Sequence, residues 1–381
     1  MDFDLVAHTE LLIVGGSRAY GLHTDASDVD LKGVAIPPRA WILGYRRTFA
    51  QVDDADTIAA FVVDLTAEEQ GIASRTKLEG SVYGLRKFIR LAADANPNIL
   101  DVLFCRDAEV RRCTPLGRRL RDARGLFLSS RARQTYSGYA RAQLGRIQRH
   151  RSWLLSPPAG APTREQFGLP EMPEIPKEER GAAEAAIRKQ LDRWELDLGD
   201  LPESSRLQVQ AEVERVLTGI AGALDPQTAK WVAAARTVGL RDDLIEALKD
   251  ERRYQTARRQ WAAYQRWAAQ RNRERAALER EHGYDTKHAA HLVRLLRMGR
   301  EVLETGEVHV WRGPGGADDA AELQAIRAGK LSYDAVVALA QEGERGLQEV
   351  VREGRVAVPP LPDEAAIDRL CVELVEAALG R

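Results

Sequence analysis

The chain has 381 residues, with 56 basic and 57 acidic side chains, a formal net charge of −1 and three cysteines. This length suggests two or three domains and allows a large core without disulfides. Three cysteines make no disulfide framework and contain no CxxC metal pattern, and no apolar run approaches the ~18 residues of a membrane span. The first residues lack the features of a signal peptide, so we expect a cytoplasmic protein that does not enter a membrane.

The first third of the chain alternates short apolar runs with helical patterns. The runs have strand composition and lie at residues 11–14, 29–31, 61–63 and 81–83. Helical spacing follows at 85–91, and Asn96–Pro97–Asn98 separates it from a second helix that starts at Ile99. We therefore expect an α+β fold over residues 1–125, with a small mixed sheet and flanking helices.

The rest of the chain has mostly helical patterns. Helices are predicted at 131–151, at 288–304 and from Asp363. The long stretch 178–280 also favours helix, with Gly- and Pro-containing turns near 199–202 and 225–226. We expect a helical domain over residues 126–381.

Residues 15–33, GGSRAYGLHTDASDVDLKG, carry the motif with the clearest chemical meaning. An apolar strand ends at two glycines, Ser17 follows, and Asp28 and Asp30 come about ten residues later on the next strand. Residues two apart on a strand share a face, so the two carboxylates project together. Such a pair can hold two divalent cations, which clamp the attacking and leaving oxygens of a phosphoryl transfer.

The residues around this acidic pair suit a triphosphate. Gly16 lets the backbone approach phosphate closely because no Cβ intervenes, and Ser17 offers a hydroxyl and free N–H groups. Arg18 and Lys32 add positive charge nearby. We predict that these four residues bind a nucleotide.

The glycine–serine turn followed by Asp-x-Asp on a strand resembles the DNA polymerase β nucleotidyltransferase superfamily. Four blocks are similar to its YcgL-like, RNA-ligase-associated (RlaP-type) group, namely residues 15–34, 82–104, 138–151 and 282–308. Residues at about 155–250 match this group poorly and form an expected insert. The resemblance implies transfer of a nucleoside monophosphate from an NTP, with ATP as the expected nucleotide, assisted by two Mg²⁺ or Mn²⁺ ions.

The superfamily uses a third carboxylate, which helps to bind the metal and activates the acceptor hydroxyl. The resemblance places this catalytic residue at Glu79, four residues before Tyr83. The context Glu79–Gly80–Ser81 is only weakly strand-like, so a solvated loop residue is a competing interpretation. Asp64, at the end of the run 61–63, is the alternative third carboxylate.

The block 282–308 adds candidates from the C-terminal part. The resemblance implies that Tyr284, Asp285, Lys287 and His288 face the active cleft, with Lys287 on the nucleotide. His288 and His291 are three residues apart on a predicted helix and would suit a metal ion, but the sequence shows no evident third ligand. A packed first turn of the helix, with Asp285 near its N-cap, is the alternative.

An acid-free stretch follows the first domain. Residues 123–164 contain eight arginines and two tyrosines but no Asp or Glu. Arginine binds phosphate and aromatic rings stack on bases. We predict that RNA is bound by Arg141, Arg146, Arg149 and Tyr139. The alternatives are that these arginines hold the triphosphate or form an ordinary solvated face.

The resemblance implies RNA repair, with an RNA or tRNA end as the acceptor and an RNA ligase as a further partner. Two other functions stay open at this point. The same site could transfer the nucleotide to a protein or a small molecule, or the chain could bind RNA or nucleotide without catalysis. A broad basic surface around Asp28 would favour RNA, and a closed pocket would favour a small molecule.

Overall fold

The computed structural model describes residues 2–196 and 226–380, apart from positions 26, 174, 270 and 272. The chain divides into two compact units, of which residues 1–156 and 272–381 form the first and residues 157–271 the second. The expected boundary at residue 125 therefore falls inside the first unit. The reason is that the helix starting at Arg131 packs against helices from the C-terminal part of the chain. The turn predicted at 199–202 lies outside the described residues.

The first unit contains a five-stranded mixed sheet with the order β3–β4–β2–β1–β5. Its strands are β1 (Thr9–Val14), β2 (Val29–Ala35), β3 (Gln51–Val52), β4 (Leu78–Gly84) and β5 (Val110–Cys113). β2 is antiparallel to β1 and parallel to β4. Three of the four strand predictions are confirmed, as is the predicted α+β class.

The predicted strand at 61–63 is wrong. These residues lie in the 3₁₀ helix η1 (Ala60–Asp64). Phe61 is fully buried, whereas Val62 and Val63 are 38% and 71% exposed. Of these three consecutive apolar residues, only Phe61 is buried, because the segment forms a helical turn and not a strand.

The two faces of the sheet carry separate cores. Val29 and Leu31 of β2 point into a small core under one group of short helices, α3 (Ala55–Ala59), η1 and α4 (Ala67–Ala73). Val34 points into the larger core on the other face, which also contains Ile13 of β1. Asp30 and Lys32 alternate with Val29 and Leu31, so they lie on the larger-core face.

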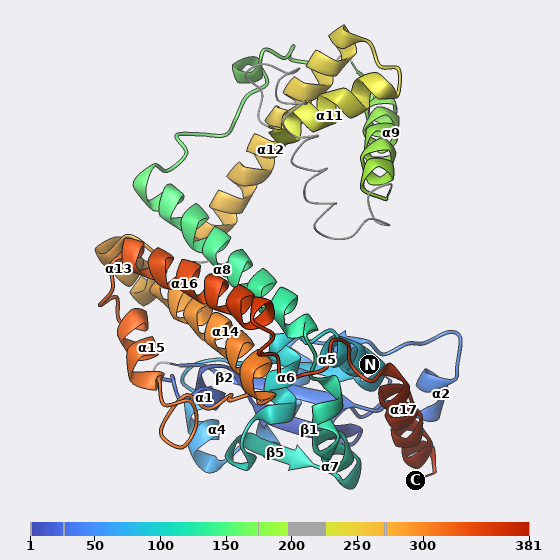
Figure 1. Cartoon of the computed structure of the whole chain (residues 1–381), viewed down its shortest axis with the longest axis vertical. Helices are drawn as coiled ribbons and strands as arrows, with labels where there is room; N and C mark the ends of the chain where they lie inside the picture. Colours follow the sequence, from blue (N-terminus) through green and yellow to red (C-terminus); the bar gives the residue numbers. More distant parts are fainter. Residues whose placement is uncertain are drawn as a thin grey trace. The chain divides into compact units, whose positions relative to one another are not determined.

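Helices cover this larger-core face. The α/β segment supplies α5 (Leu85–Ala93), α6 (Pro97–Phe104) and α7 (Pro115–Asp122), and the short elements are α1 (Gly16–Ala19), α2 (Arg39–Ile42), η2 (Asp107–Glu109) and η3 (Arg124–Phe127). Figure 1 shows three longer helices side by side above the sheet, namely α8 (Arg131–Leu155), α14 (Thr286–Thr305) and α16 (Tyr333–Arg352). The remaining helices of the unit are α13 (Arg273–His282), α15 (Ala320–Arg327) and α17 (Glu364–Leu379). The helix predictions at 85–91, 99, 131–151, 288–304 and 363 are confirmed.

α8 and α14 approach each other closely where α14 carries a glycine. A Cβ on Gly299 would lie 2.7 Å from the Cβ of Tyr136, which is fully buried on α8. Real Cβ atoms do not come this close, so a larger residue at 299 would push the two helices apart. α14 ends at Gly306, whose φ of +72° is the left-handed conformation that glycine adopts readily.

The second unit is helical and has its own small core. Its elements are η4 (Glu165–Phe167), α9 (Lys177–Leu196), α11 (Pro226–Thr237) and α12 (Asp242–Ala269). Ile187, Trp231 and Ile245 are among its buried residues. Buried Glu251 forms ion pairs with Arg164 at 2.9 Å and with Arg180 at 2.7 Å. The insert expected at about 155–250 overlaps most of this unit.

Among the described residues, no helix combines the length and the apolar character needed to cross a membrane.

Candidate active site

The Asp-x-Asp motif lies where β1 ends and β2 begins. The Gly15 N–H donates to the Asp30 carbonyl at 2.7 Å, which ties the glycine turn to β2. Gly16 has a φ of +60°, and a Cβ there would lie 2.1 Å from Oδ2 of Asp30. The Asp30 carboxylate thus lies directly against the glycine–serine turn, and only glycine fits at position 16.

Glu79 lies beside Asp30 in the sheet. β2 and β4 are parallel, with Asp30 opposite Glu79 in their register. Neighbouring strands lie about 4.8 Å apart and direct paired side chains to the same face. Glu79 also forms an ion pair with Lys77, which precedes β4. The sheet therefore brings a third carboxylate from a distant segment to the Asp-x-Asp pair.

Asp64, the alternative third carboxylate, lies elsewhere. It accepts hydrogen bonds from Nε and Nη2 of Arg112 at 3.1 Å and 2.8 Å. Arg112 is on β5, which is separated from β4 by β2 and β1. Asp64 therefore pairs with a side chain at the opposite edge of the sheet from Glu79.

The electrostatics of the motif suit bound cations. Burial raises the pKa of Asp30 above its usual 3.8, and the charges of Glu79 and Asp28 raise it further. Lys32 and Lys287 act in the opposite direction. A dication beside Asp30 would offset the repulsion that this carboxylate meets from Asp28 and Glu79, and an all-oxygen donor set is the one that Mg²⁺ and Mn²⁺ prefer.

The predicted nucleotide-binding cations come from both ends of the chain. Lys287 is exposed in the first turn of α14, and its charge acts on Asp30 although 257 positions separate them. The Lys32 side chain lies along the turn, since a Cβ on Gly15 would be 3.4 Å from Lys32 Cδ. Burial lowers the pKa of Lys32. Arg18 instead donates to the Ser27 carbonyl at 3.2 Å, which braces the loop before Asp28.

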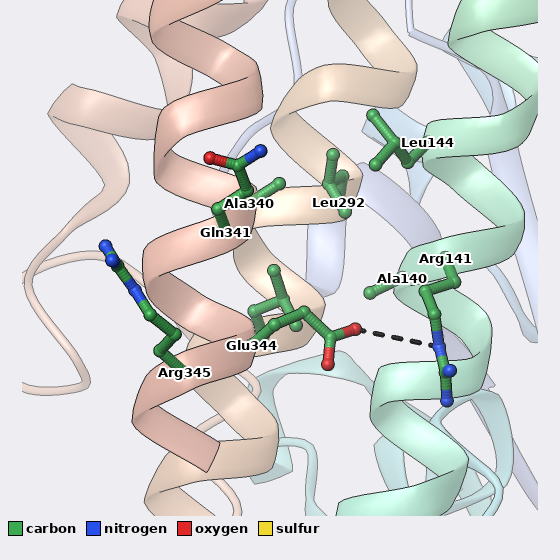
Figure 2. Close-up of a pocket in the computed structure, with 9 residues that line it drawn as sticks. Ala140, Arg141, Leu144, Leu292, Ala340, Gln341, Glu344 and Arg345 are labelled. Carbon is green, nitrogen blue, oxygen red and sulfur yellow. Dashed lines mark ion pairs between the residues drawn. The ribbon is translucent and has the colours of Figure 1, made fainter. Parts of the chain in front are cut away.

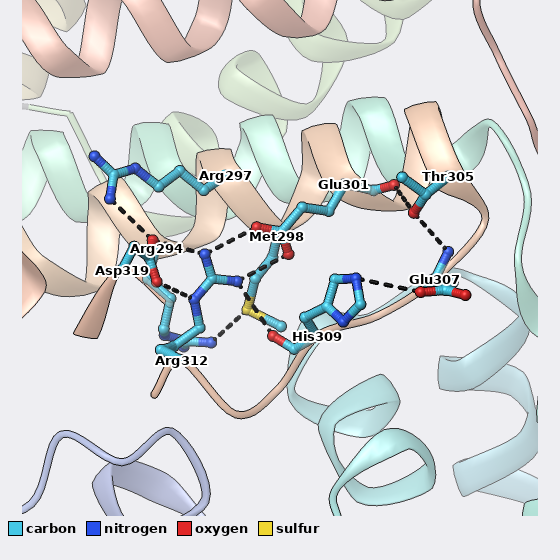
Figure 3. Close-up of polar contacts among 9 residues, drawn as sticks. All are labelled: Arg294, Arg297, Met298, Glu301, Thr305, Glu307, His309, Arg312 and Asp319. Atoms are coloured by element: carbon cyan, nitrogen blue, oxygen red, sulfur yellow. Dashed lines mark hydrogen bonds and ion pairs between the residues drawn. The ribbon is translucent and has the colours of Figure 1, made fainter. Parts of the chain in front are cut away.

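A buried polar group behind the motif escaped the sequence analysis. Tyr20 donates to Asp101 Oδ2 at 2.5 Å, and the Arg294 guanidinium lies 3.5 Å from the centre of the Tyr20 ring. Arg294 is 1% exposed and contacts Met298 Sδ at 2.9 Å (Figure 3). The sequence signal for this buried group was Arg294, an arginine among the leucines of α14. Burial raises the pKa of Tyr20, so this hydroxyl keeps its proton.

A second buried arginine holds the loop after α14 (Figure 3). Arg312 is 1% exposed and donates to Glu301 of α14 at 2.8 Å and to Asp319 at 2.7 Å. Arg297 also reaches Asp319 at 2.9 Å. These pairs are structural, because every charge involved has a partner of opposite sign within the same cluster.

The predicted RNA-binding residues differ in their surroundings. Arg146 and Arg149 are exposed on α8 and form no ion pair within the part of the chain that the structure describes. Arg141 lies 3.8 Å from Glu344 of α16, at the edge of a pocket of about 350 Å³ between α8, α14 and α16 (Figure 2). Tyr139 is half-buried and its hydroxyl accepts from Asn96 at 2.7 Å.

The residues implied to face the cleft around α14 do not act alike. Tyr284 is fully buried and donates to the Leu331 carbonyl at 2.7 Å, so it faces the core because its hydroxyl has a partner there. Asp285 is also fully buried and caps α14 by accepting from the His288 N–H at 3.0 Å. His291 contacts Arg294 at 3.4 Å instead of sharing a ligand position with His288. Lys287 alone of these residues is exposed.

Residues 8–153 match the RlaP family, described as the RNA repair pathway DNA polymerase beta family. The RlaP match runs from the residue before β1 into α8, and includes the glycine–serine turn, Asp28, Asp30 and Glu79. The RlaP-type resemblance expected from the sequence is thereby confirmed for this part of the chain. α14 and Lys287 lie outside the RlaP match. No match was found among curated proteins or among solved structures.

Proposed function

We propose that the chain is a metal-dependent nucleotidyltransferase that moves a nucleoside monophosphate from an NTP to a hydroxyl of RNA and releases pyrophosphate. The observation that carries this proposal is the position of Glu79 opposite Asp30, with the Asp30 carboxylate against the glycine–serine turn. The match of residues 8–153 to an RNA repair family supports RNA as the acceptor.

The proposed site residues have separate roles in binding metal and triphosphate. Asp28, Asp30 and Glu79 would hold Mg²⁺ or Mn²⁺, which when bound polarises the phosphoryl oxygens. The backbone of Gly16 and the hydroxyl of Ser17 contact the triphosphate. Gly16 has no side chain, so a phosphate can approach its backbone closely, beside the Asp30 carboxylate. Lys32 and Lys287 balance the negative charge of the triphosphate.

The acceptor oxygen forms a bond to the α-phosphorus as the bond from that phosphorus to the bridging oxygen breaks. The Glu79 carboxylate accepts the proton of the acceptor hydroxyl, and pyrophosphate leaves with the electrons of the broken bond. Glu79 suits this role because it lies at the edge of the acidic group, on β4, and is half-exposed, with 46% of its side chain accessible. An acceptor can reach it without crossing the core.

Arg146 and Arg149 on α8 are the side chains that we propose hold the RNA backbone, because both are exposed and available for phosphate. Arg141 has a carboxylate neighbour, Glu344, and contributes less. ATP as the nucleotide, an RNA ligase as a partner and a cytoplasmic location stay predictions.

The test is transfer of label from each α-labelled NTP, with Mg²⁺ or Mn²⁺, to RNA with a free 3′ hydroxyl, to RNA with a blocked end and to total protein. We expect label on the free RNA end, and none with Asp30→Asn. Label on protein and not on RNA would contradict RNA as the acceptor and keep the transferase. No label from any NTP with the wild-type chain would contradict the transferase itself.

A further inference from the structure

A second group of metal-binding side chains lies in the first unit, apart from the Asp-x-Asp motif. His150 of α8, Glu279 of α13 and Asp285 at the start of α14 each offer one ligand atom, and these atoms lie within 4.8 Å of one another. Glu279 is 3% exposed and Asp285 is fully buried. Side chains from α8, from α13 and from the start of α14 thus meet at one point.

His288 lies beside this group and is not one of its three members. Its Nε2 lies 3.5 Å from Asp285 Oδ2, and Nδ1 of His150 lies 3.5 Å from the same oxygen. The other oxygen of Asp285 accepts from the His288 N–H at 3.0 Å. This cap fixes the orientation of the carboxylate, so that Oδ2 faces both imidazoles.

The spacing of these atoms fits coordination better than hydrogen bonding. Good N–H···O bonds have heavy-atom distances of about 2.7–3.2 Å, and both contacts are longer. Four ligands with bonds of about 2.0–2.1 Å to a tetrahedral Zn²⁺ lie about 3.3–3.4 Å from one another. The 3.5 Å contact between His150 and Asp285 is close to an edge of such a tetrahedron.

The imidazole rings are held in place by their neighbours. The His150 ring stacks on Trp153 with 5.6 Å between centroids, and meets the edge of the His288 ring at 6.0 Å. Only 14% of the His150 side chain and 17% of the His288 side chain are exposed. Ligands that are ordered before the metal binds lose little conformational freedom on binding it.

The donor set and the burial decide the class of ion. Two carboxylates balance the charge of a dication, and the His150 imidazole is the third protein ligand. Imidazole favours Zn²⁺ over Mg²⁺, which prefers oxygen. Three protein ligands leave the fourth position of a tetrahedral ion to water or another ligand.

We propose that His150, Glu279 and Asp285 form a Zn²⁺ site that joins α8, α13 and the first turn of α14. This site is separate from the Asp28–Asp30–Glu79 group and has a different donor set. It fixes the turn of α14 that carries Lys287 one residue before His288.

The experiment starts from the full chain purified without chelator. We expect about one zinc per chain by elemental analysis, and after removal of metal a rise in Tm on adding Zn²⁺ but not on adding Mg²⁺ alone. Co²⁺ in place of Zn²⁺ should give the intense visible absorption of a tetrahedral ion. A folded, metal-free chain that shows neither Zn²⁺ binding nor a Zn²⁺-dependent Tm would overturn the proposal.

Variants locate the ion. His150→Ala and Glu279→Gln should each weaken Zn²⁺ binding by on the order of 100-fold or more and change the Co²⁺ spectrum. If one of them fails to fold, the other supplies the test.

Two controls complete the design. His309→Asn is the matched control, since His309 lies 3.3 Å from Glu307 in a single surface pair, and it should bind zinc as the wild type does. Asp30→Asn should also keep its zinc. Loss of zinc from Asp30→Asn, or unchanged zinc in both His150→Ala and Glu279→Gln, would contradict the assignment.

Discussion

The two acidic groups of the first unit contain similar charges and differ in everything around them. The Asp28–Asp30–Glu79 group has only carboxylate donors, two nearby lysines and half-exposed side chains. The group around Asp285 combines two carboxylates with the His150 imidazole and is nearly closed to solvent. Exposure and donor type, more than the number of acids, therefore separate the proposed nucleotide site from the proposed zinc site.

The same comparison explains how the two groups are built. Of the proposed catalytic carboxylates, Asp30 and Glu79 come from adjacent strands, whose register places them opposite each other, and Asp28 immediately precedes β2. The second group comes from helix ends and from a helix face, where side chains converge through packing. A strand pair holds its side chains in a row that leaves one side open, whereas three converging helices surround theirs.

The largest expected effect is at Asp28 and Asp30. Asp28→Asn or Asp30→Asn should lower transfer by on the order of 10³-fold, because the loss of metal binding removes several kcal/mol of transition-state stabilisation. Zinc content should stay unchanged. Rates of label transfer and elemental analysis on the same preparation check both halves. Near wild-type turnover in either variant would remove these residues from the site.

Glu79 should affect chemistry more than nucleotide binding. We expect Glu79→Gln to lower kcat by about 10²-fold with little change in KM for the NTP, if it accepts the proton of the acceptor. Asp64→Asn is the matched control. It should lower stability by about 1–3 kcal/mol, because Arg112 loses a charged partner, and leave kcat unchanged. The reverse pattern in steady-state kinetics would make Asp64 the third carboxylate.

Lys287 connects the catalytic motif to the helix that begins at the second group. Lys287→Gln should raise KM for the NTP by about tenfold and change kcat less, because the exposed ammonium contributes attraction to the triphosphate over a screened distance. Nucleotide titration at fixed RNA measures this. Lys330→Gln, an exposed lysine of the same unit, is the control. An unchanged KM would separate Lys287 from the nucleotide.

α8 itself shows both kinds of surface, since His150 lies in the buried group while Arg146 and Arg149 are exposed. Replacing both arginines by Gln should reduce the slope of log K against log salt for RNA by about 1.4–1.8, one phosphate contact for each arginine. Arg141→Gln should change the slope less, because Glu344 already lies beside it. Filter binding without NTP, at several salt concentrations, measures the slopes. Equal slopes for wild type and double variant would show that these arginines do not hold RNA.

The smallest expected effect concerns the stability of the metal-free protein. Burial raises the pKa of Asp30, so the folded chain binds this proton more tightly than the unfolded chain, and stability falls as the pH rises above the usual value of 3.8. Asp30→Asn removes that ionisation. Without divalent ions near neutral pH, we expect its Tm to be about 1–3 °C higher than that of the wild type. The gain should vanish under acid conditions, where wild-type Asp30 is protonated, and a lower Tm at neutral pH would contradict it.

Features encoded within a short segment were determined by the sequence. The apolar run before Gly16, the spacing from Ser17 to Asp28 and the alternation through Asp30 predicted a strand, a turn and a second strand, and β2 begins at Val29, one residue after Asp28. Each of these signals depends on neighbours within about fifteen residues. The helix at 131–151 and the class of fold were predictable for the same reason, because amphipathic periodicity is local.

Only the tertiary structure decided which distant groups meet. Glu79 and Asp64 had comparable local contexts, and the β2–β4 register and Arg112 separated them. Arg141 gained its neighbour Glu344 from α16, and Asp285 gained His150 from α8, more than a hundred residues away. Periodicity tells which face of a helix is apolar, but it does not tell which helix will cover that face. Side chains from separate elements therefore became a site only when packing brought them together.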